Sequence, residues 1–472
     1  MPRSRGASAA QVAPWRGRSY PSFFLFSVST TATTSTTEPG PAASKPLSLG
    51  VIFLTLYIDL IGFSISFPLI PRMLTYYLHQ EGGAGLLGWL LRQVQALAPP
   101  SGQDPLFVAA LLGGVLSAAY SLLQFLFAPI WGARSDRIGR RPVLLLTVAG
   151  TAGSYLLWAF SGSFWLFIVA RLFGGAMSGN LSVATAAVAD VTTRENRAKG
   201  MGLIGVAFGL GFITGPMIGG IIGAVEPGAR WAQFGINPFS AVAFVALGFS
   251  LLNLAWIGRR FRETLPADRR SQPNEERTRN PLRALFAIRN IAVRRANLVY
   301  FLMVLVFAGY EITVSFLATE RLHYNEHQMT YIFVFVGLIS ILTQGLLVRR
   351  LVPRFGEKLG ALGGLTLIAA GFALLAFAGS TLPVYTALAL TSVGSGFANV
   401  AFSSLISLYS GADEQGKVLG VFRSLGSLAR AVGPLVAGVV FWWYGSLLTY
   451  VLSAVLLLVP IAVGLSLPKP VK

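Results

Sequence analysis

Apolar stretches long enough to cross a lipid bilayer make up most of this sequence. A helix needs about 20 apolar residues to span the hydrocarbon core, and in lipid its backbone must satisfy its own hydrogen bonds. Only 12% of the residues are charged, about half of the ~25% found in soluble domains. The stretches of sufficient length are 49–71, 107–131, 142–160, 164–188, 200–224, 238–258, 296–318, 327–348, 359–379, 383–409, 417–442 and 446–467. The sequence therefore predicts an all-α integral membrane protein with twelve transmembrane helices.

The polar segment 259–295 divides these stretches into two groups of six. It contains eleven arginines and four acids, so it is predicted to be a basic linker outside the membrane. Lys and Arg gather on the cytoplasmic side of membrane proteins. With the N-terminus on that side, thirty of the 37 Lys and Arg residues lie in cytoplasmic segments and four lie outside. We therefore expect cytoplasmic termini, an N-terminal bundle at 48–258 and a C-terminal bundle at 296–467.

The two halves repeat each other in sequence. Residues 202–220 align without gaps on 420–438 at an offset of 218, which pairs one Gly-Pro dipeptide, at 215–216, with another at 433–434. A weaker repeat pairs 137–141 with 354–358 at an offset of 217. We therefore predict two pseudo-symmetric six-helix bundles repeated in parallel, an architecture known from transporters that bind substrate between the halves near the midplane.

Residues 1–47 have a different composition from the rest of the chain. They are rich in Ser, Thr, Ala and Pro, contain several arginines and have no acid before Glu38. Such a segment cannot bury enough apolar surface to fold, so we expect a disordered cytoplasmic tail. The same composition also resembles an organelle transit peptide, which leaves a targeting segment as the alternative.

Several other classes of protein are excluded by the sequence. The net charge of +19 lies in segments between apolar spans, whereas nucleic-acid binders place it on one face among aromatic residues. There is no cysteine, and His79, His323 and His327 are too scattered for a metal site. Residues 411–418 resemble a phosphate-binding loop but lack its final Ser or Thr and join two membrane spans. We therefore expect no nucleic acid, no metal and no enzymatic reaction.

Residues 132–141 are predicted to form a short basic loop between two apolar spans, and they read Gly-Ala-Arg-Ser-Asp-Arg-Ile-Gly-Arg-Arg. This stretch resembles the G-x-x-x-D-R-x-G-R-R signature of the major facilitator superfamily. Residues 59–71 resemble the first-helix signature of the drug–proton antiporter branch of that family. Residues 171–176 resemble the fourth-helix arginine motif, and residues 211–220 resemble the fifth-helix antiporter motif. The resemblance covers 48–467 and is greatest to the tetracycline transporter-like members of animals, relatives of the bacterial tetracycline exporters. Such relatives are associated with export of drugs and organic anions. The resemblance also implies the major facilitator fold.

The first signature implies a conformational latch at the cytoplasmic side. In this interpretation Asp136 docks on neighbouring helix ends when that side is closed, because an acid near a helix N-terminus is stabilised by about 0.3–1 kcal/mol. The alternative is that the arginines only set the membrane topology. The residues of the predicted latch are Gly132, Asp136, Arg137, Gly139, Arg140 and Arg141.

Three ionisable residues inside the spans are the candidates for proton coupling. Asp59 and Glu311 lie deep in the first and seventh spans, and intramembrane acids usually face a water-filled cavity or a partner. A carboxyl group taken out of water binds a proton more readily, which suits a proton carrier. Arg171 stays charged and therefore needs an anion or carbonyls, with Asp59 or a substrate carboxylate as candidates. The alternative for each residue is a structural role between helices.

Two further groups complete the predicted machinery. The antiporter helix motif consists of Gly211, Gly215, Pro216, Gly219 and Gly220, whose small residues allow close helix approach and whose proline bends the helix. Mid-span polar and aromatic residues could line a cavity for an amphipathic ligand, although each could equally serve helix packing. The candidates are Tyr120, Gln124, Asn180, Tyr310, Gln344, Asn399 and Arg430.

The resemblance implies a secondary transporter that exports drugs or small organic ions in exchange for protons, by alternating access. The proton gradient would drive it without a cofactor, and we expect it to act as a monomer in the lipid bilayer on a small-molecule substrate. The alternatives are a non-transporting scaffold or receptor on the same fold, or a uniporter or symporter. The sequence does not distinguish among the plasma membrane, the nuclear envelope and the endolysosome.

Overall fold

The computed structural model describes residues 47–81, 85–97, 104–193, 197–223, 225, 234–267, 270, 288–410 and 415–469. The chain divides into two compact units, Met1–Lys45 and Pro46–Lys472, and everything below concerns the second unit. The predicted tail, apart from Leu47, and most of the predicted linker lie outside the described residues.

The described part of the first half is mainly helical. Its elements are α1 (Leu49–Ser64), the 3-10 turn η1 (Phe67–Leu69), α2 (Ile70–Glu81), α3 (Gly85–Leu97), α4 (Pro105–Ile138), α5 (Arg140–Ala159), α6 (Phe164–Met177), α7 (Asn180–Val191), α8 (Arg197–Ile222) and α9 (Ser240–Arg260). Helix α3 lies between the first two spans and is an element that the apolar pattern does not predict.

The second half is again helical. Its elements are α11 (Ile291–Leu322), α12 (Glu326–Leu342), the π-helical η5 (Thr343–Val348), α13 (Arg349–Phe355), α14 (Glu357–Phe377), α15 (Thr381–Tyr409) and α16 (Gln415–Leu465). Within the described chain, eleven helical stretches are long and apolar enough to cross a membrane. The last of these is two helices, because Gly445 has φ 75° and ψ −177° and interrupts α16. The predicted twelve-helix fold is confirmed.

The predicted loop at 132–141 is almost entirely helical. Helix α4 runs to Ile138 and α5 begins at Arg140, so only Gly139 leaves the helical conformation, with φ 106°. That conformation is open to glycine and costly for other residues. Gly356 makes the same break between α13 and α14, with φ 89°. The loop prediction was wrong because helices can continue beyond the hydrocarbon core, where Arg137 is exposed to solvent and Arg140 is paired with carboxylates. The end of the bundle with these two breaks is called the basic end below, and the opposite end is called the far end.

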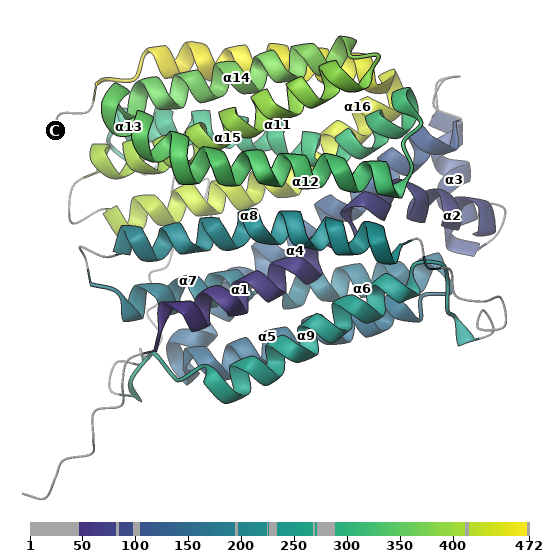
Figure 1. Cartoon of the computed structure of the whole chain (residues 1–472), viewed down its shortest axis with the longest axis horizontal. Coiled ribbons are helices and arrows are strands. Elements are labelled where there is room, and N and C mark those ends of the chain that lie inside the picture. Colours follow the sequence, from purple (N-terminus) through teal and green to yellow (C-terminus); the bar gives the residue numbers. More distant parts are fainter. Residues whose placement is uncertain are drawn as a thin grey trace, which may run out of the picture. The chain divides into compact units, whose positions relative to one another are not determined.

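Small residues bring the two halves together. A Cβ on Gly114 of α4 would lie only 2.5 Å from the Pro434 carbonyl oxygen of α16, and Gly438 lies beside Gly114. Helices α8 and α12 also lie side by side (Figure 1). A Cβ on Gly209 of α8 would lie 3.3 Å from the Ile341 side chain. The α4–α16 contact lies in the far part of α4, so the halves are closed against each other there.

The packing inside each half follows the sequence repeat. Gly215 of α8 lies against Ile61 and Ser64 of α1, and Gly433 of α16 lies against Leu305 and Ala308 of α11. Since 215 and 433 differ by the repeat offset of 218, the contacts relate α1 to α11 by an offset of 244. This second offset allows any position in the first span to be compared with its counterpart in the seventh.

Candidate functional site

The first carboxyl group inside the membrane spans is held by an asparagine. Asn180 begins α7, directly after the break that follows Met177, and its Nδ2 donates to Asp59 Oδ1 over 2.8 Å. A longer contact of 3.5 Å joins the same nitrogen to Thr151 Oγ1 of α5. The amide oxygen of Asn180 is buried and accepts no hydrogen bond from the described residues. A predicted cavity residue is therefore placed directly on the predicted proton carrier.

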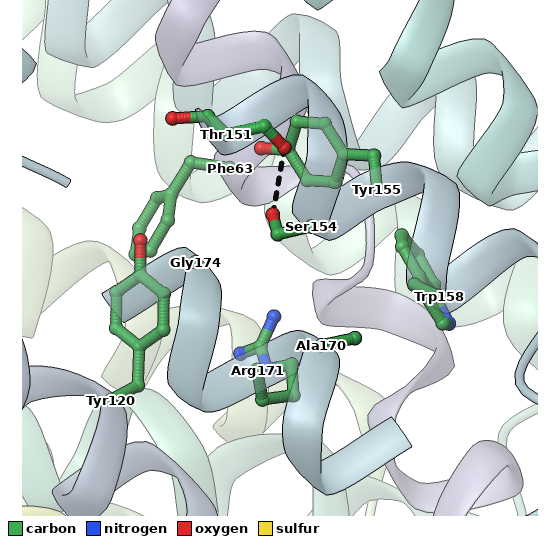
Figure 2. A pocket seen from close by; sticks show the side chains of 9 residues that line it. All are labelled: Phe63, Tyr120, Thr151, Ser154, Tyr155, Trp158, Ala170, Arg171 and Gly174. Atoms are coloured by element: carbon green, nitrogen blue, oxygen red, sulfur yellow. Dashed lines mark hydrogen bonds between the residues drawn. The ribbon is translucent and has the colours of Figure 1, made fainter. Parts of the chain in front are cut away.

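Arg171 points into a small pocket within the first half (Figure 2). Its guanidinium lies over the Tyr120 ring, 5.2 Å from the centroid, a distance at which cation and ring attract. The pocket has a volume of about 20 Å³, enough for one water molecule. Its other lining residues are Phe63, Thr151, Ser154, Tyr155, Trp158, Ala170 and Gly174.

The expected anion for Arg171 is not in place. Its guanidinium forms no ion pair or hydrogen bond with any residue that the structure describes, and the carboxylate of Asp59 is bonded to Asn180 instead. The contact with Tyr120 only partly replaces the hydration of a charged group.

The second half contains an ion pair between two spans. Arg430 Nη1 of α16 donates to Glu311 Oε2 of α11 over 3.1 Å. The two side chains are 48% and 28% exposed, respectively, although both lie well inside apolar helices. Charged groups at such positions face the bundle interior or a water-filled cavity and not lipid. The pair is therefore turned toward the interior between the helices.

The remaining cavity candidates divide into three groups. Asn399 accepts a 3.3 Å hydrogen bond from Tyr300, which lies on the same side of the second half as Arg430. Gln344 is exposed and lies in η5, and Gln124 is half-buried in α4. Tyr310 is instead buried in the core, with its ring 5.2 Å from that of Phe372.

The basic end of the first half is organised around Arg140. Its side chain is only 7% exposed and donates to Asp136 over 2.6 Å and to Asp190 over 2.9 Å. It also donates to Ser135 over 2.7 Å. The backbone nitrogens of Arg140 and Arg141 donate to the Glu263 carboxylate over 2.8 and 3.1 Å. Glu263 thus caps the start of α5, where a negative charge is favoured.

Asp190 and Glu263 are functional candidates that the sequence prediction missed. The available signal was an acid among arginines, at the end of one span and at the start of the predicted linker. Among the other predicted latch residues, Arg137 is exposed and Gly132 lies beside Ser182 of α7. The hydrogen bonds and ion pairs of the Arg140 side chain all stay within the first half, and its backbone nitrogen bonds to Glu263 at the start of the linker.

The glycines of the predicted antiporter motif face two different neighbours. Gly211 and Gly215 lie directly against α1, the helix that carries Asp59, and Gly219 lies against Ile65 just after its end. Gly220 lies against Thr330 of α12 in the other half, and the Pro216 carbonyl accepts a long 3.5 Å hydrogen bond from the same threonine. The motif therefore links the Asp59 helix to the opposite half through α8.

Two repeated six-helix halves that meet through small residues, with ionisable side chains in the middle of their spans, define a membrane transport protein. The chain belongs to the Major Facilitator Superfamily, whose sequence pattern matches residues 52–434 and 300–471.

Known members of the family support this assignment. The chain is 35% identical over 445 residues to the major facilitator superfamily domain-containing protein 10 of Bos taurus, covering 90% of this chain and 93% of that protein. It is 31% identical over 334 residues to the class B tetracycline resistance protein of Escherichia coli, covering 70% of this chain and 78% of that protein. The crystal structure of the human organic anion transporter MFSD10 (TETRAN) matches with a TM-score of 0.71 at 34% identity, covering 88% of this chain and 98% of that one. The predicted resemblance is confirmed.

Proposed function

We propose that the chain is a proton-coupled antiporter of small organic ions that works by alternating access, with the basic end in the cytoplasm. The observation that carries this proposal is one carboxyl group inside the predicted spans of each half, Asp59 and Glu311. Asp59 is hydrogen-bonded to Asn180, and Glu311 is hydrogen-bonded to Arg430. An ionised carboxylate only accepts hydrogen bonds, whereas a protonated one also donates. Proton binding would therefore change the contacts with Asn180 and Arg430, and the proton gradient would drive transport without a cofactor.

Antiport is supported by the glycine motif at 211–220 and by the similarity to tetracycline resistance proteins. Alternating access requires that one end of the central space opens while the other closes. The contact of Gly114 with Pro434 and Gly438 closes the far part of α4 against α16. The substrate class is supported by Arg171 and Arg430, two charged groups suited to an anion, and by the human relative described as an organic anion transporter.

The ion pair favours a second candidate, co-transport of an anion with a proton. An anion that takes Arg430 displaces the Glu311 carboxylate, and a carboxylate that loses its cation binds a proton more readily. Binding of the anion then favours binding of the proton at this ion pair, and the reverse. Antiport instead requires that anion and proton compete for binding. Under antiport the competition would have to arise at Asp59 and Arg171.

The two modes move protons in opposite directions. The full-length chain would be placed in liposomes that contain a pH-sensitive dye, with 1-naphthalenesulfonate as the probe because it keeps its charge and crosses lipid slowly. A probe gradient directed inward makes the lumen alkaline under antiport and acidic under co-transport. We expect the double variant Asp59→Asn, Glu311→Gln to lose this proton movement and Glu320→Gln, at the far end of α11, to keep it. Unchanged proton movement in the double variant would refute coupling through these residues.

The proposed orientation has a separate test. The chain contains no cysteine, so Arg259→Cys at the basic end and Gln80→Cys near the far end of α2 can each be labelled alone. Both positions are exposed. In sealed vesicles of known sidedness, an impermeant maleimide should reach Arg259→Cys only from the cytoplasmic side and Gln80→Cys only from the other side.

A further inference from the structure

The repeat places two phenylalanines where the second half has its ion pair. The offset of 244 relates Glu311 of α11 to Phe67, and the offset of 218 relates Arg430 of α16 to Phe212 of α8. Phe67 and Phe212 are also in contact, as a T-shaped pair with ring centroids 5.4 Å apart. The same two positions of the repeat are therefore in contact in both halves, ionic in one and aromatic in the other.

Equivalent positions of parallel repeats face each other across the central space at the same depth, because the halves are related by an axis along the membrane normal. The wall opposite Glu311 and Arg430 is therefore aromatic. Phe63 extends it, with its ring 5.4 Å from Phe67 and 6.2 Å from Phe212. All three phenylalanines are half-buried, so part of each ring is accessible. We call Phe63, Phe67 and Phe212 the aromatic wall.

The backbone at Phe67 gives a second, independent indication. Helix α1 ends at Ser64, a 3-10 turn covers Phe67–Leu69, and α2 begins at Ile70. Broken helices inside a membrane protein occur where the backbone lines a cavity or is packed in protein, and transporters place such breaks at their substrate sites. The break thus coincides with the residue that faces the ion pair.

We propose that the aromatic wall holds the ring system of an organic anion whose charged group binds Arg430 on the opposite side. This inference rests on the proposed function, because it takes the central space to be the substrate path, and it adds the orientation of the substrate and two residues that determine specificity. Phe67 and Phe212 select ring-bearing anions over aliphatic ones, since ring faces and edges attract another ring beyond what burial of apolar area provides. Arg430 selects the anion over its neutral counterpart.

Binding to the purified full-length chain, measured by isothermal titration calorimetry, tests this orientation with three matched probes. These are 1-naphthalenesulfonate, its neutral counterpart 1-naphthalenesulfonamide, and octanesulfonate, an anion without a ring. Phe67→Leu and Phe212→Leu retain apolar volume but remove the ring. We expect each to weaken 1-naphthalenesulfonate about three- to tenfold and to change octanesulfonate less than about twofold. Arg430→Gln should weaken both sulfonates and leave the sulfonamide unchanged.

Phe244→Leu is the matched control, because Phe244 contacts only Phe160 among the ring pairs of the described chain; it should bind all three probes as the wild type does. Phe67→Tyr and Phe212→Tyr keep the ring and should retain affinity, which covers the case in which a leucine variant fails to fold. Equal losses for the two sulfonates, unchanged affinity in both leucine variants, or no binding to the wild type would overturn the inference. If the binding results are as expected but the wild type shows no probe-driven proton movement, the proposed function is refuted and the orientation of the bound anion is not.

Discussion

Replacement of Arg140 should destabilise the basic end far more than replacement of Arg137, its neighbour in the same motif. The Arg140 guanidinium is 7% exposed and bonds Asp136 at 2.6 Å and Asp190 at 2.9 Å. Arg137 lies in the last turn of α4 and is exposed. Arg140→Ala therefore leaves two carboxylates side by side without their shared cation, whereas Arg137→Ala leaves the cluster intact.

The size of the effect follows from this burial. Removal of one partner from a buried ion pair costs about 3–5 kcal/mol, because the remaining charge stays uncompensated. Asp136 and Asp190 keep side-chain exposures of 25% and 19%, so water can partly hydrate them after the substitution. We therefore expect a loss of about 3 kcal/mol for Arg140→Ala, near the low end of that range. An exposed charge such as that of Arg137 contributes about 0–1 kcal/mol.

Thermal unfolding of the purified protein in one detergent, at a single scan rate, measures the difference. A loss of 3 kcal/mol corresponds to a melting temperature lower by roughly 3–6 °C, because the shift per kcal/mol falls as the chain becomes longer. Arg140→Lys keeps the charge but not the forked geometry, so it should fall between wild type and Arg140→Ala. Equal melting temperatures for Arg140→Ala and Arg137→Ala would refute the reasoning, since burial would then not decide the contribution of these arginines.

Three further predictions concern the spans and their far ends. Arg321 donates to three carbonyls at the end of α14 and to Ser446, so Arg321→Ala should cost about 2–3 kcal/mol in the same unfolding assay, and a loss below 0.5 kcal/mol would contradict this. Gly114→Val adds side-chain atoms against the Pro434 carbonyl. It should prevent closure of α4 on α16 and abolish 1-naphthalenesulfonate flux in liposomes while the protein stays folded. Normal flux would show that this contact is dispensable. Glu311→Gln removes the charge that competes for Arg430. The attraction between two unit charges at this distance in water is about 1.4 kcal/mol, so the affinity for 1-naphthalenesulfonate should rise about tenfold. An unchanged or lower affinity would argue against displacement of Glu311 by the anion.

The sequence alone determined the class of fold, because lipid leaves the backbone few solutions. Twelve apolar stretches, the linker and the 218-residue repeat sufficed to predict two six-helix halves, and intramembrane charge marked Asp59, Arg171, Glu311 and Arg430. Periodicity in a helix that is apolar on all sides does not show which way a side chain points. The sequence therefore did not show that Tyr310 is directed into the core.

Only the tertiary structure decided which side chains pair with each other. Asp59 is bonded to Asn180, 121 residues away, and not to Arg171, while Arg430 meets Glu311 across 119 residues. Glu263, at the start of the linker, caps α5 although it lies 123 residues after Arg140 in the sequence. Such contacts depend on the rotation and close approach of helices, and glycine packing such as that of Gly215 on α1 permits that approach. A composition rule can place a charge at a depth in the membrane, but only the packed helices determine which charge lies within hydrogen-bond distance of it.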